Sequence, residues 1–583
     1  MSASRRVLRL AMLRVVVCVL AIPLLRTFAA QAQTASQITP PSFRPDLTNP
    51  GGFALPSASG LATPAGAEKL FVRLSGVSIS GGRPELAAAT AALEARLTRK
   101  RVSGADIFAA ARELETAYAA VGYVLVRVLL PPQKLVDGGR LKLVVVDGFI
   151  ERIITKDVPE RVRARIETLV GPLTGRRGVT LREIERRVLL AGDTPGVILR
   201  STLQPGAAEG ATVLVIDAKY QAASESVTVD NTLSKALGRT TFGVGLDLNS
   251  VAGLGELVYL RAGGHPEGGE NGLFDRYPRN RTLAAGVVLP TWVDGLTFNA
   301  EYTDARTTPL AVAGVQTTDT FDRLSLRLRY AWLRGRNTNF NSELAFDAQD
   351  ETNSLFVGGV PVPLSEDRLR ILRFANDGDI FTPWGATLSG RATGSFGIDG
   401  LGARDAADAT PALPLSRAGA DASFQKLEVA LGYDQTLIEH LAINASLRAQ
   451  TSFNQPLPSS EQIGIANTTG LSAFDAGSVN GDQGYVVRGE LVSPWSVPWP
   501  TNTLGVVVAP YLFGAYGEVS LERPTVLEAT TTQATSFGGG LRIGGAAPGT
   551  LSNGSLTLEY GHSHRSDGVP AGDRFIVVSA FKF

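Results

Sequence analysis

The sequence predicts a membrane β-barrel of antiparallel strands that follows two small α/β domains. Residues 225–583 consist of segments of about ten residues that alternate apolar and polar side chains, separated by Gly, Asn, Asp and Pro clusters. Two earlier stretches repeat one order of strands and helices at a spacing of roughly 75 residues. Beyond its N-terminus the 583-residue chain has no apolar run of 18 residues, which excludes a bundle of membrane-spanning helices.

Residues 1–32 have the pattern of a secretory signal peptide. An apolar run over 15–25 follows a group of arginines and precedes Ala30-Gln31-Ala32, a small-residue cleavage site. The alternative, a short membrane anchor, is disfavoured because so short a run does not span a bilayer. Loss of this segment removes Cys18 and leaves a net charge of −4, because the segment carries five arginines and no acidic residue. The mature chain therefore has no disulfide or thiolate chemistry, and its charge suggests no nucleic-acid partner.

Residues 33–66 are predicted to form an extended, mobile linker. Prolines are spaced through the segment and interrupt any long helix. We therefore expect no helix of three or more turns, and no plug helix, in this stretch. The prolines are Pro40, Pro41, Pro45, Pro50, Pro56 and Pro64.

The two α/β domains are predicted at 67–147 and 148–222, each with the order β-α-α-β-β. Thr180 and Glu183 form a capping-box signature at the start of the last helix. In the first domain, the elements are expected at 71–79, 84–99, 103–122, 123–130 and 141–146. In the second, they are expected at 149–155, 159–170, 180–190, 198–203 and 212–218.

The barrel is predicted to occupy residues 223–583. One segment shows the alternation clearly, with Leu324, Leu326, Leu328, Tyr330 and Trp332 on one face and Arg323, Ser325, Arg327 and Arg329 on the other. A soluble β-sandwich alternates too, but with its apolar face inward. The signal peptide, the 19% charged residues and a last segment ending on the aromatic Phe583 favour the membrane barrel.

The sequence shows no constellation for catalysis or metal binding. There is no HExxH, Gly-x-Ser-x-Gly or nucleotide-binding loop. His562 and His564 share one strand face, yet no third ligand lies near them, so a solvated barrel face is favoured over a metal pair. We expect a protein that is not an enzyme and needs no cofactor or metal.

Five stretches in order make the chain resemble the haemolysin secretion/activation family, the transporter partners of two-partner secretion. They are Val229-Asp230-Asn231, 397–403 (GIDGLGA), 415–421 (LSRAGAD), 457–462 (LPSSEQ) and 481–485 (GDQGY). The resemblance implies two periplasmic POTRA domains and an outer-membrane barrel of about sixteen strands. It also implies export, without ATP, of an unfolded secreted partner protein, which is expected to be β-helical.

The resemblance also places a loop tip inside the barrel. The family's sixth loop carries an arginine at its tip that pairs with an aspartate on the barrel wall. Ungapped counting places the tip on Leu471, Ser472, Ala473 and Phe474, and it assigns Val487-Arg488 to the following strand. The wall position falls on Phe513, Ala515 and Gly517, with Ala515 in place of the aspartate. Since both partners are absent, we expect other contacts to hold the loop, with Phe474 and Asp475 as candidates.

Two interaction surfaces are also expected. The apolar stretch Tyr123, Val124, Val126, Val128 and Leu130 is a candidate sheet edge for capture of the client by β-augmentation, unless it is an ordinary inner strand. The basic residues of one segment either follow an extended polypeptide in the lumen or balance lumen acids, and charge balance is favoured. They are Arg323, Arg327 and Arg329, with Arg334 and Arg336.

Two other functions compete with export. The first is assembly of other outer-membrane proteins, and the second is a passive porin. The number of domains and the quoted motifs disfavour the first, and about 150 residues of α/β domains disfavour the second.

Overall fold

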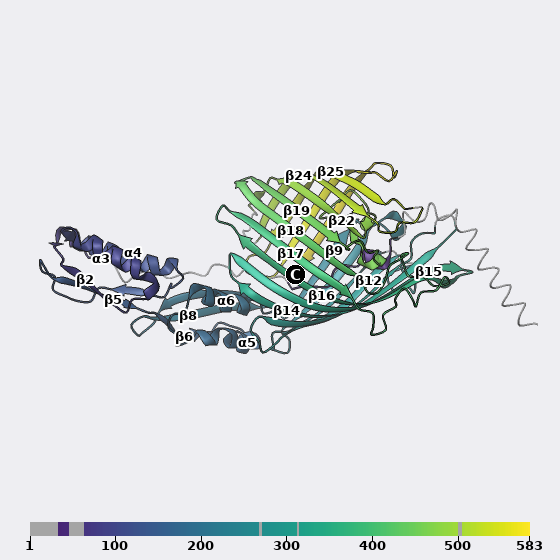
Figure 1. Ribbon diagram of the computed structural model, residues 1–583. Helices are drawn as coiled ribbons and strands as arrows, with labels where there is room; N and C mark the ends of the chain where they lie inside the picture. The colour runs from purple at the N-terminus through teal and green to yellow at the C-terminus, as the bar shows by residue number, and fades with distance from the viewer. Residues whose placement is uncertain (1–32, 46–62, 267–270, 312–313, 499–503, 527) are drawn as a thin grey trace, which may run out of the picture.

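The computed structural model describes residues 33–45, 63–266, 271–311, 314–498, 504–526 and 528–583. An arm of two small domains projects from one mouth of a closed β-barrel (Figure 1). We call this the module-side mouth and the opposite opening the far mouth. The predicted signal peptide lies outside the described residues. In the described ranges no helix has the length and apolar character needed to cross a membrane.

The first module is a three-stranded sheet covered by two helices. Its sheet has the order β2-β5-β4, with β2 parallel and β4 antiparallel to β5. Leu97, Ile107 and Tyr118 from the helices fill the core against Leu141 and Leu143. The elements are β2 (Gly76–Ser80), α3 (Ala87–Thr98), α4 (Gly104–Ala120), β4 (Arg127–Leu129) and β5 (Arg140–Val146), preceded by a β1 (Phe71–Val72) that pairs with β3 (Val102–Ser103).

The second module repeats this topology, as the repeat in the sequence predicts. Its sheet has the order β6-β8-β7, with the same parallel and antiparallel pairs. The predicted capping box is confirmed, since Thr180 and Glu183 exchange backbone-to-side-chain bonds of 3.0 and 3.3 Å. The elements are β6 (Phe149–Ile154), α5 (Glu160–Val170), α6 (Leu181–Gly192), β7 (Val197–Pro205) and β8 (Ala211–Tyr220).

The strand predicted over 123–130 is wrong in its length. The chain turns after α4, because Gly122 has φ +98° and the Tyr123 N–H bonds back to the Tyr118 carbonyl. Only Arg127–Leu129 pairs with β5. Leu125 leaves the first module and packs in the core of the second. The stretch is apolar because it joins two cores, not because it forms one long strand.

The barrel is closed and has sixteen antiparallel strands, as the resemblance implies. The short β23 continues the line of β22 along β24 after a break at Ser493-Pro494. The first strand, β9, closes the barrel against the last, β27. The strands are β9 (Ala223–Asp230), β10 (Thr241–Asn249), β11 (Leu257–Gly264), β12 (Asn280–Pro290), β13 (Leu296–Thr307), β14 (Thr317–Arg334), β15 (Thr338–Val357), β16 (Val360–Phe381), β17 (Ala386–Gly397), β18 (Gln425–Ile438), β19 (Leu441–Thr451), β22 (Gln483–Val492), β23 (Trp495–Val497), β24 (Gly505–Ser520), β25 (Thr531–Ala546), β26 (Asn553–Arg565) and β27 (Gly572–Lys582).

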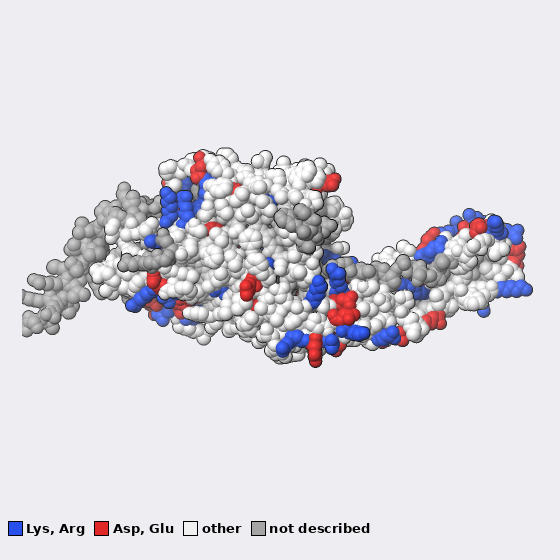
Figure 2. All heavy atoms as spheres, turned by 180° about the vertical axis from the view of Figure 1, so that it is seen from behind, with Lys and Arg blue, Asp and Glu red and all other residues white. Residues whose placement is uncertain are grey.

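The strand faces point as the alternation predicts. Along β14, Leu324, Leu328 and Trp332 lie exposed on the outer wall, whereas Ser325 and Arg327 are buried in the lumen. Figure 2 shows few charged side chains on the middle of the barrel wall and many over the modules. An apolar outer band with a polar interior is the arrangement that a membrane barrel requires and a β-sandwich lacks.

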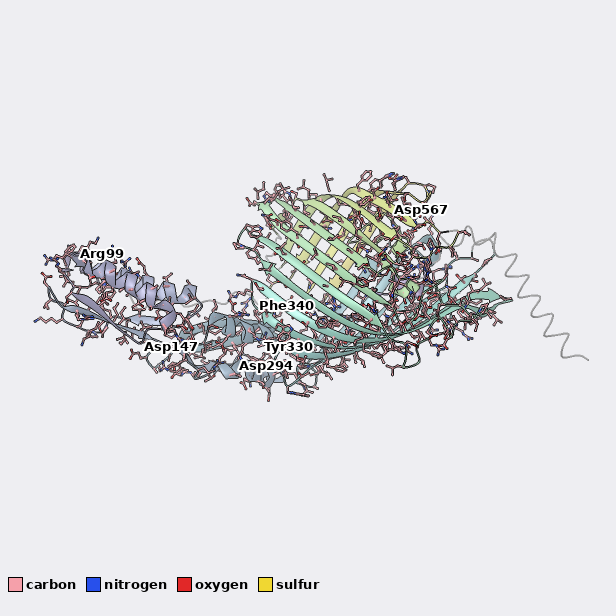
Figure 3. All side chains as sticks on the ribbon, viewed as in Figure 1. Arg99, Asp147, Asp294, Tyr330, Phe340 and Asp567 are labelled. Atoms are coloured by element: carbon pink, nitrogen blue, oxygen red, sulfur yellow. The ribbon has the colours of Figure 1, made fainter. Side chains whose placement is uncertain are left out.

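The second module is held to the barrel by charged contacts. Asp193, which follows α6, accepts two bonds of 2.8 Å from Arg334 at the end of β14. Arg187 on α6 contacts Asp294 in the β12–β13 turn at 2.8 Å. Asp294 and Tyr330 mark this junction in Figure 3. The arginines at the end of β14 thus connect the pore to its arm.

Candidate functional site

The loop between β19 and β22, residues 452–482, fills part of the lumen. It is the sixth loop at the far mouth. Ile463, Ile465 and Leu471 of the loop are fully buried and pack against Val519 and Ala534 of the barrel wall. Gly517 leaves room for this packing, because a Cβ there would lie 2.8 Å from the Ile465 side chain. The loop is therefore folded inward as a packed element of the lumen.

An arginine on the barrel wall binds the loop tip. Arg488 lies on β22 and donates to the Ser472 hydroxyl at 2.7 Å and to the Gly470 carbonyl at 3.2 Å. The guanidinium also pairs with Glu559 at 2.7 Å and with Glu490 at 2.8 Å. It is stacked 4.0 Å from the Phe513 ring centroid. The arginine thus comes from the wall and its acceptor from the loop.

The predicted wall position lies beside this arginine. Ala515 on β24 is the cross-strand partner of Arg488 and packs in the same cluster as the loop residues. The structure therefore brings together Ser472, Phe513, Ala515 and Gly517, which the sequence analysis had grouped only by resemblance.

The rest of the tip is tied to the barrel seam. Asp475 forms an ion pair with Arg574 of β27, and the same guanidinium donates to the carbonyls of Asn231 and Leu233 at 2.7 and 3.0 Å. Phe474 packs against the apolar cluster around Leu471. Arg574 therefore connects the loop to the closure between β9 and β27.

The base of the loop is anchored by charged pairs. Glu461 accepts bonds of 2.6 and 3.0 Å from Arg373 and pairs with Lys426 at 2.8 Å. Asp482 is fully buried and pairs with Arg417 at 3.4 Å. Arg417, Glu461 and Asp482 lie in three stretches that carried the resemblance (415–421, 457–462 and 481–485), and no role was predicted for them from the sequence.

A second segment occupies the lumen beside the loop. Residues 33–45 run from the level of Thr307, near the far mouth, to Glu343, near the module-side mouth. They contain one helical turn, α2 (Ala35–Ile38), and otherwise lie extended. The Phe43 ring lies 4.4 Å from the Tyr259 ring centroid and beneath the Arg261 guanidinium.

This placement corrects the prediction of a mobile linker for the described part of 33–66. Prolines keep the segment extended, as expected, but lumen side chains supply the hydrogen-bond partners that a helix would have provided. The Phe43 N–H, for example, donates to Glu301, and the Ala35 N–H, which begins α2 and has no partner within the turn, donates to Asp319. In the described residues 33–45 and 63–66 no helix reaches three turns, and residues 46–62 lie outside the described part.

The candidate capture edge in the first module is short and already bonded. The Val128 N–H of β4 donates to Glu115 of α4 at 2.8 Å, and the side chain of Arg127 donates to the carbonyls of Val124 and Val126. Burial raises the pKa of the Glu115 carboxyl, and the hydrogen bond from the Val128 N–H partly offsets this rise. Of the five candidate residues, Val128 alone lies within a strand; Tyr123, Val124 and Val126 precede it, and Leu130 follows it.

The longer free edge is in the second module. The nine-residue β7 ends the sheet order β6-β8-β7, and in the described residues no strand pairs with its outer side. Because Gly196 accepts a bond from Gln221 and Gly206 donates to Ala211, the N–H groups of Leu199, Ser201 and Leu203 point away from β8.

The histidines form no metal site in the described structure. His562 pairs with Asp573 at 2.8 Å, and no group of three or more His, Cys, Asp or Glu residues with metal-binding geometry occurs in the described ranges. The lumen presents charged and hydrogen-bonding side chains to the sixth loop and to residues 33–45.

Comparison with known protein families shows which family the chain belongs to. The model of the family "Haemolysin secretion/activation protein ShlB/FhaC/HecB" matches residues 210–543, and the ShlB-type POTRA domain matches residues 72–148. The protein belongs to this family. Its two modules and barrel are thus those of an outer-membrane transporter with a POTRA region. We accordingly call the module-side mouth periplasmic and the far mouth extracellular.

One relative matches part of the chain in sequence, and two solved structures share its fold. A heme/hemopexin transporter protein, HuxB of Haemophilus influenzae strain 86-028NP, is 28% identical over 165 residues, which are 28% of this chain and 29% of HuxB. The matched region therefore spans less than a third of that relative. CdiB from Escherichia coli shares the fold with a TM-score of 0.65 and 19% identity, covering 92% of this chain and 94% of CdiB. CdiB from Acinetobacter baumannii gives a TM-score of 0.58 and 14% identity over 99% and 98% of the two chains.

Three arginines of the site were not predicted to be functional residues from the sequence. Arg488 was placed on the correct strand but given no role, and Arg574 and Arg373 were not singled out. Each lies at a lumen-facing position of an alternating strand, which is the one sequence signal that marks them. Arg574 and Arg373 have partners 99 and 88 residues away, and Arg488 reaches Ser472 across 16 residues of loop, so these contacts could not be predicted from sequence spacing.

Proposed function

We propose that this protein is an outer-membrane pore that exports an unfolded secreted partner protein without ATP. The observation that carries the proposal is a closed barrel whose lumen holds two segments, the sixth loop and residues 33–45. Withdrawal of either would widen a path lined with charged groups. The mechanism is binding and release rather than bond-making chemistry, and folding of the client outside biases the direction of transport.

The arm at the periplasmic mouth is proposed to capture the client. An unfolded chain can add as a strand to a free sheet edge, which supplies main-chain hydrogen bonds without demanding a sequence. The β7 edge suits this role better than β4, because it is longer and its outward N–H groups at 199, 201 and 203 are not bonded by a neighbouring helix as Val128 is. We propose β7 as the main capture edge, with β4 as a minor one.

The test is secretion of the large, β-helical protein that we expect to be encoded beside this gene. Co-expression should release the client into the medium, and Ser201→Pro should reduce release strongly. Proline at this position removes an outward N–H that β8 does not use, so the ladder stays intact. Thr202→Ala, which shortens an exposed side chain and leaves the main chain unchanged, is the matched control.

Two results would decide against this proposal. Client release that does not depend on the pore would exclude export. Normal release by Ser201→Pro, with the barrel inserted and heat-modifiable, would exclude capture at β7. Insertion of other outer-membrane proteins, impaired when this protein is absent, would favour the assembly function instead.

A further inference from the structure

The contacts between residues 33–45 and the barrel wall are made mainly through the main chain. Asp319 accepts a hydrogen bond from the Ala35 N–H at 2.9 Å, and Glu351 accepts one from the Ser36 N–H at 3.3 Å. Glu301 accepts the Phe43 N–H at 2.8 Å. Ala35 and Ser36 begin the helical turn α2, where the first N–H groups have no partner within the turn, whereas Phe43 lies in the extended part of the segment. Each carboxylate thus binds a main-chain N–H, a group that nearly every residue of any polypeptide carries.

Arginines of the same wall bind the carbonyls. Arg323 donates to the Pro40 carbonyl at 3.2 Å, and Arg327 donates to the Phe43 carbonyl at 2.8 Å. Prolines are common in the segment, and each contributes a carbonyl acceptor to the main chain but no N–H donor. Guanidinium donors thus suit an extended chain that forms no regular secondary structure.

The wall has hydrogen-bonding capacity that this segment does not use. In the described residues the Nε atoms of Arg323 and Arg327 and the Oε2 atom of Glu351 are buried without a hydrogen-bond partner. Glu301 contacts both arginines, at 3.3 and 3.4 Å. Simple balance of lumen charge leaves these atoms unexplained, because buried polar groups are usually satisfied.

We propose that Glu301, Asp319, Arg323, Arg327 and Glu351 form a main-chain track that binds an extended polypeptide in transit. Residues 33–45 occupy the track when no client is present. The track lies on β13, β14 and β15, and its ligand is peptide backbone of any sequence. Phe43, held between Tyr259 and Arg261, adds one aromatic contact that a client residue can replace. This inference rests on the proposed export function and names the surface that the client would touch.

Planar-bilayer recording can test the track without a client. The full chain lacking residues 33–45 should form an open pore that an acetylated peptide of sequence 33–45 blocks. A scrambled peptide that keeps its phenylalanine at the same position should block within about threefold of that concentration, because the backbone is the ligand. Methylation of the amide nitrogens of Ala35, Ser36 and Phe43 should weaken block by about tenfold or more, since three bonds to carboxylates are lost.

A wall variant supplies the second arm. Arg323→Gln with Arg327→Gln should weaken block by both unmethylated peptides by about tenfold, whereas the control Arg542→Gln, a lumen arginine of β25 paired with Glu490, should leave block unchanged. Heat-modifiability reports whether each variant is folded. The methylated peptide tests the same bonds in an unmutated wall.

The outcomes of these experiments separate failure of the track from failure of the export function. Block by the native peptide but not by the scrambled one would show a dedicated plug and overturn the track. Equal block by the methylated peptide would overturn main-chain binding. If peptides block as expected and no client is exported in the secretion assay, the track stands and the export function fails.

Discussion

Arg488 shows how one side chain can replace a contact that sits elsewhere in relatives. In the family arrangement that the sequence suggested, the arginine belongs to the loop. Here the loop supplies only the Ser472 hydroxyl, and the wall supplies the guanidinium. The bond stays charge-assisted, because one of its partners is still ionised. Two acids of the barrel wall, Glu490 and Glu559, surround Arg488, so its loss would leave both carboxylates without this cation.

Substitution of Arg488 by alanine should release the loop tip. The change leaves Glu490 and Glu559 without their shared cation in the lumen, a loss that in buried pairs costs about 3–5 kcal/mol. We expect larger and more frequent conductance fluctuations in planar bilayers and a lower temperature of heat modification. Combining Arg488→Met with Glu559→Gln should restore part of the heat-modification temperature, and a double variant as damaged as the single one would contradict this account.

Glu115 is a buried titratable residue of the first module, and its carboxyl accepts the Val128 N–H. Its raised pKa means that the folded module holds a proton at a higher pH than the unfolded chain does. Its contribution to stability is therefore fully present below the ordinary carboxyl pKa and is lost as the pH rises through the raised value. Glu115→Gln, which has no charge and can still accept the Val128 N–H, should remove this pH dependence.

Amide hydrogen exchange on the whole protein can measure this pH dependence at the Val128 N–H. After correction for intrinsic rates, protection of the Val128 N–H should fall with rising pH in the parent and stay level in Glu115→Gln. Glu115→Ala, which leaves the N–H without its acceptor, should lower protection at every pH. The same pH slope in parent and glutamine variant would show that another group is responsible.

At the scale of elements, the closure between β9 and β27 is short and relies on side chains. Asn231 follows β9 and clamps the last strand, donating to the Phe575 carbonyl at 3.0 Å and accepting from the Val577 N–H at 2.8 Å. The Val-Asp-Asn stretch that the sequence analysis noted thus ends in a residue that closes the barrel. Arg574, one residue from this clamp, carries the link to the sixth loop.

Asn231→Ala should weaken the closure. Two hydrogen bonds of roughly 1 kcal/mol each are lost at the edge of the ladder, so the barrel should unfold in detergent at a lower temperature on gels. Asn553→Ala, at the start of β26, removes an exposed side chain that bonds only its own loop and serves as control. An equal shift for the two variants would mean that the seam has no special role.

At the scale of the whole molecule, the pore and its arm form a continuous structure. Leu125 of the first module packs in the core of the second, and the second module is bound to the barrel through Asp193 and Arg334. Deletion of the first module would therefore open the core of the second. Point changes in β7 test capture more cleanly than truncation.

Breaking the Asp193–Arg334 contact should loosen the arm without unfolding either part. Since the mature chain has no cysteine, Glu185→Cys with Arg336→Cys gives one defined pair across the interface, where the native side chains meet at 3.3 Å. A short bismaleimide should cross-link it efficiently. Adding Arg334→Gln should reduce the yield several-fold, and adding Arg542→Gln, far from the interface, should not. Unchanged yield with Arg334→Gln would show that the arm is held elsewhere.

Helix periodicity, caps and strand alternation are local properties of the chain, and they predicted the order of elements, the two repeated modules and the face of each barrel strand. The family resemblance, and not a local pattern, was the basis for placing the loop tip at 471–474 and the missing ion pair at 472 and 515. Only the tertiary structure decided that Arg488 binds the tip, that Arg574 joins the loop to the seam, and that residues 33–45 lie in the lumen. The stretch 123–130 is another example. Its apolar composition was evident in the sequence, but only the structure showed that it joins the cores of the two modules. Closure of a barrel brings together side chains separated by hundreds of residues, and no local period records which of them meet.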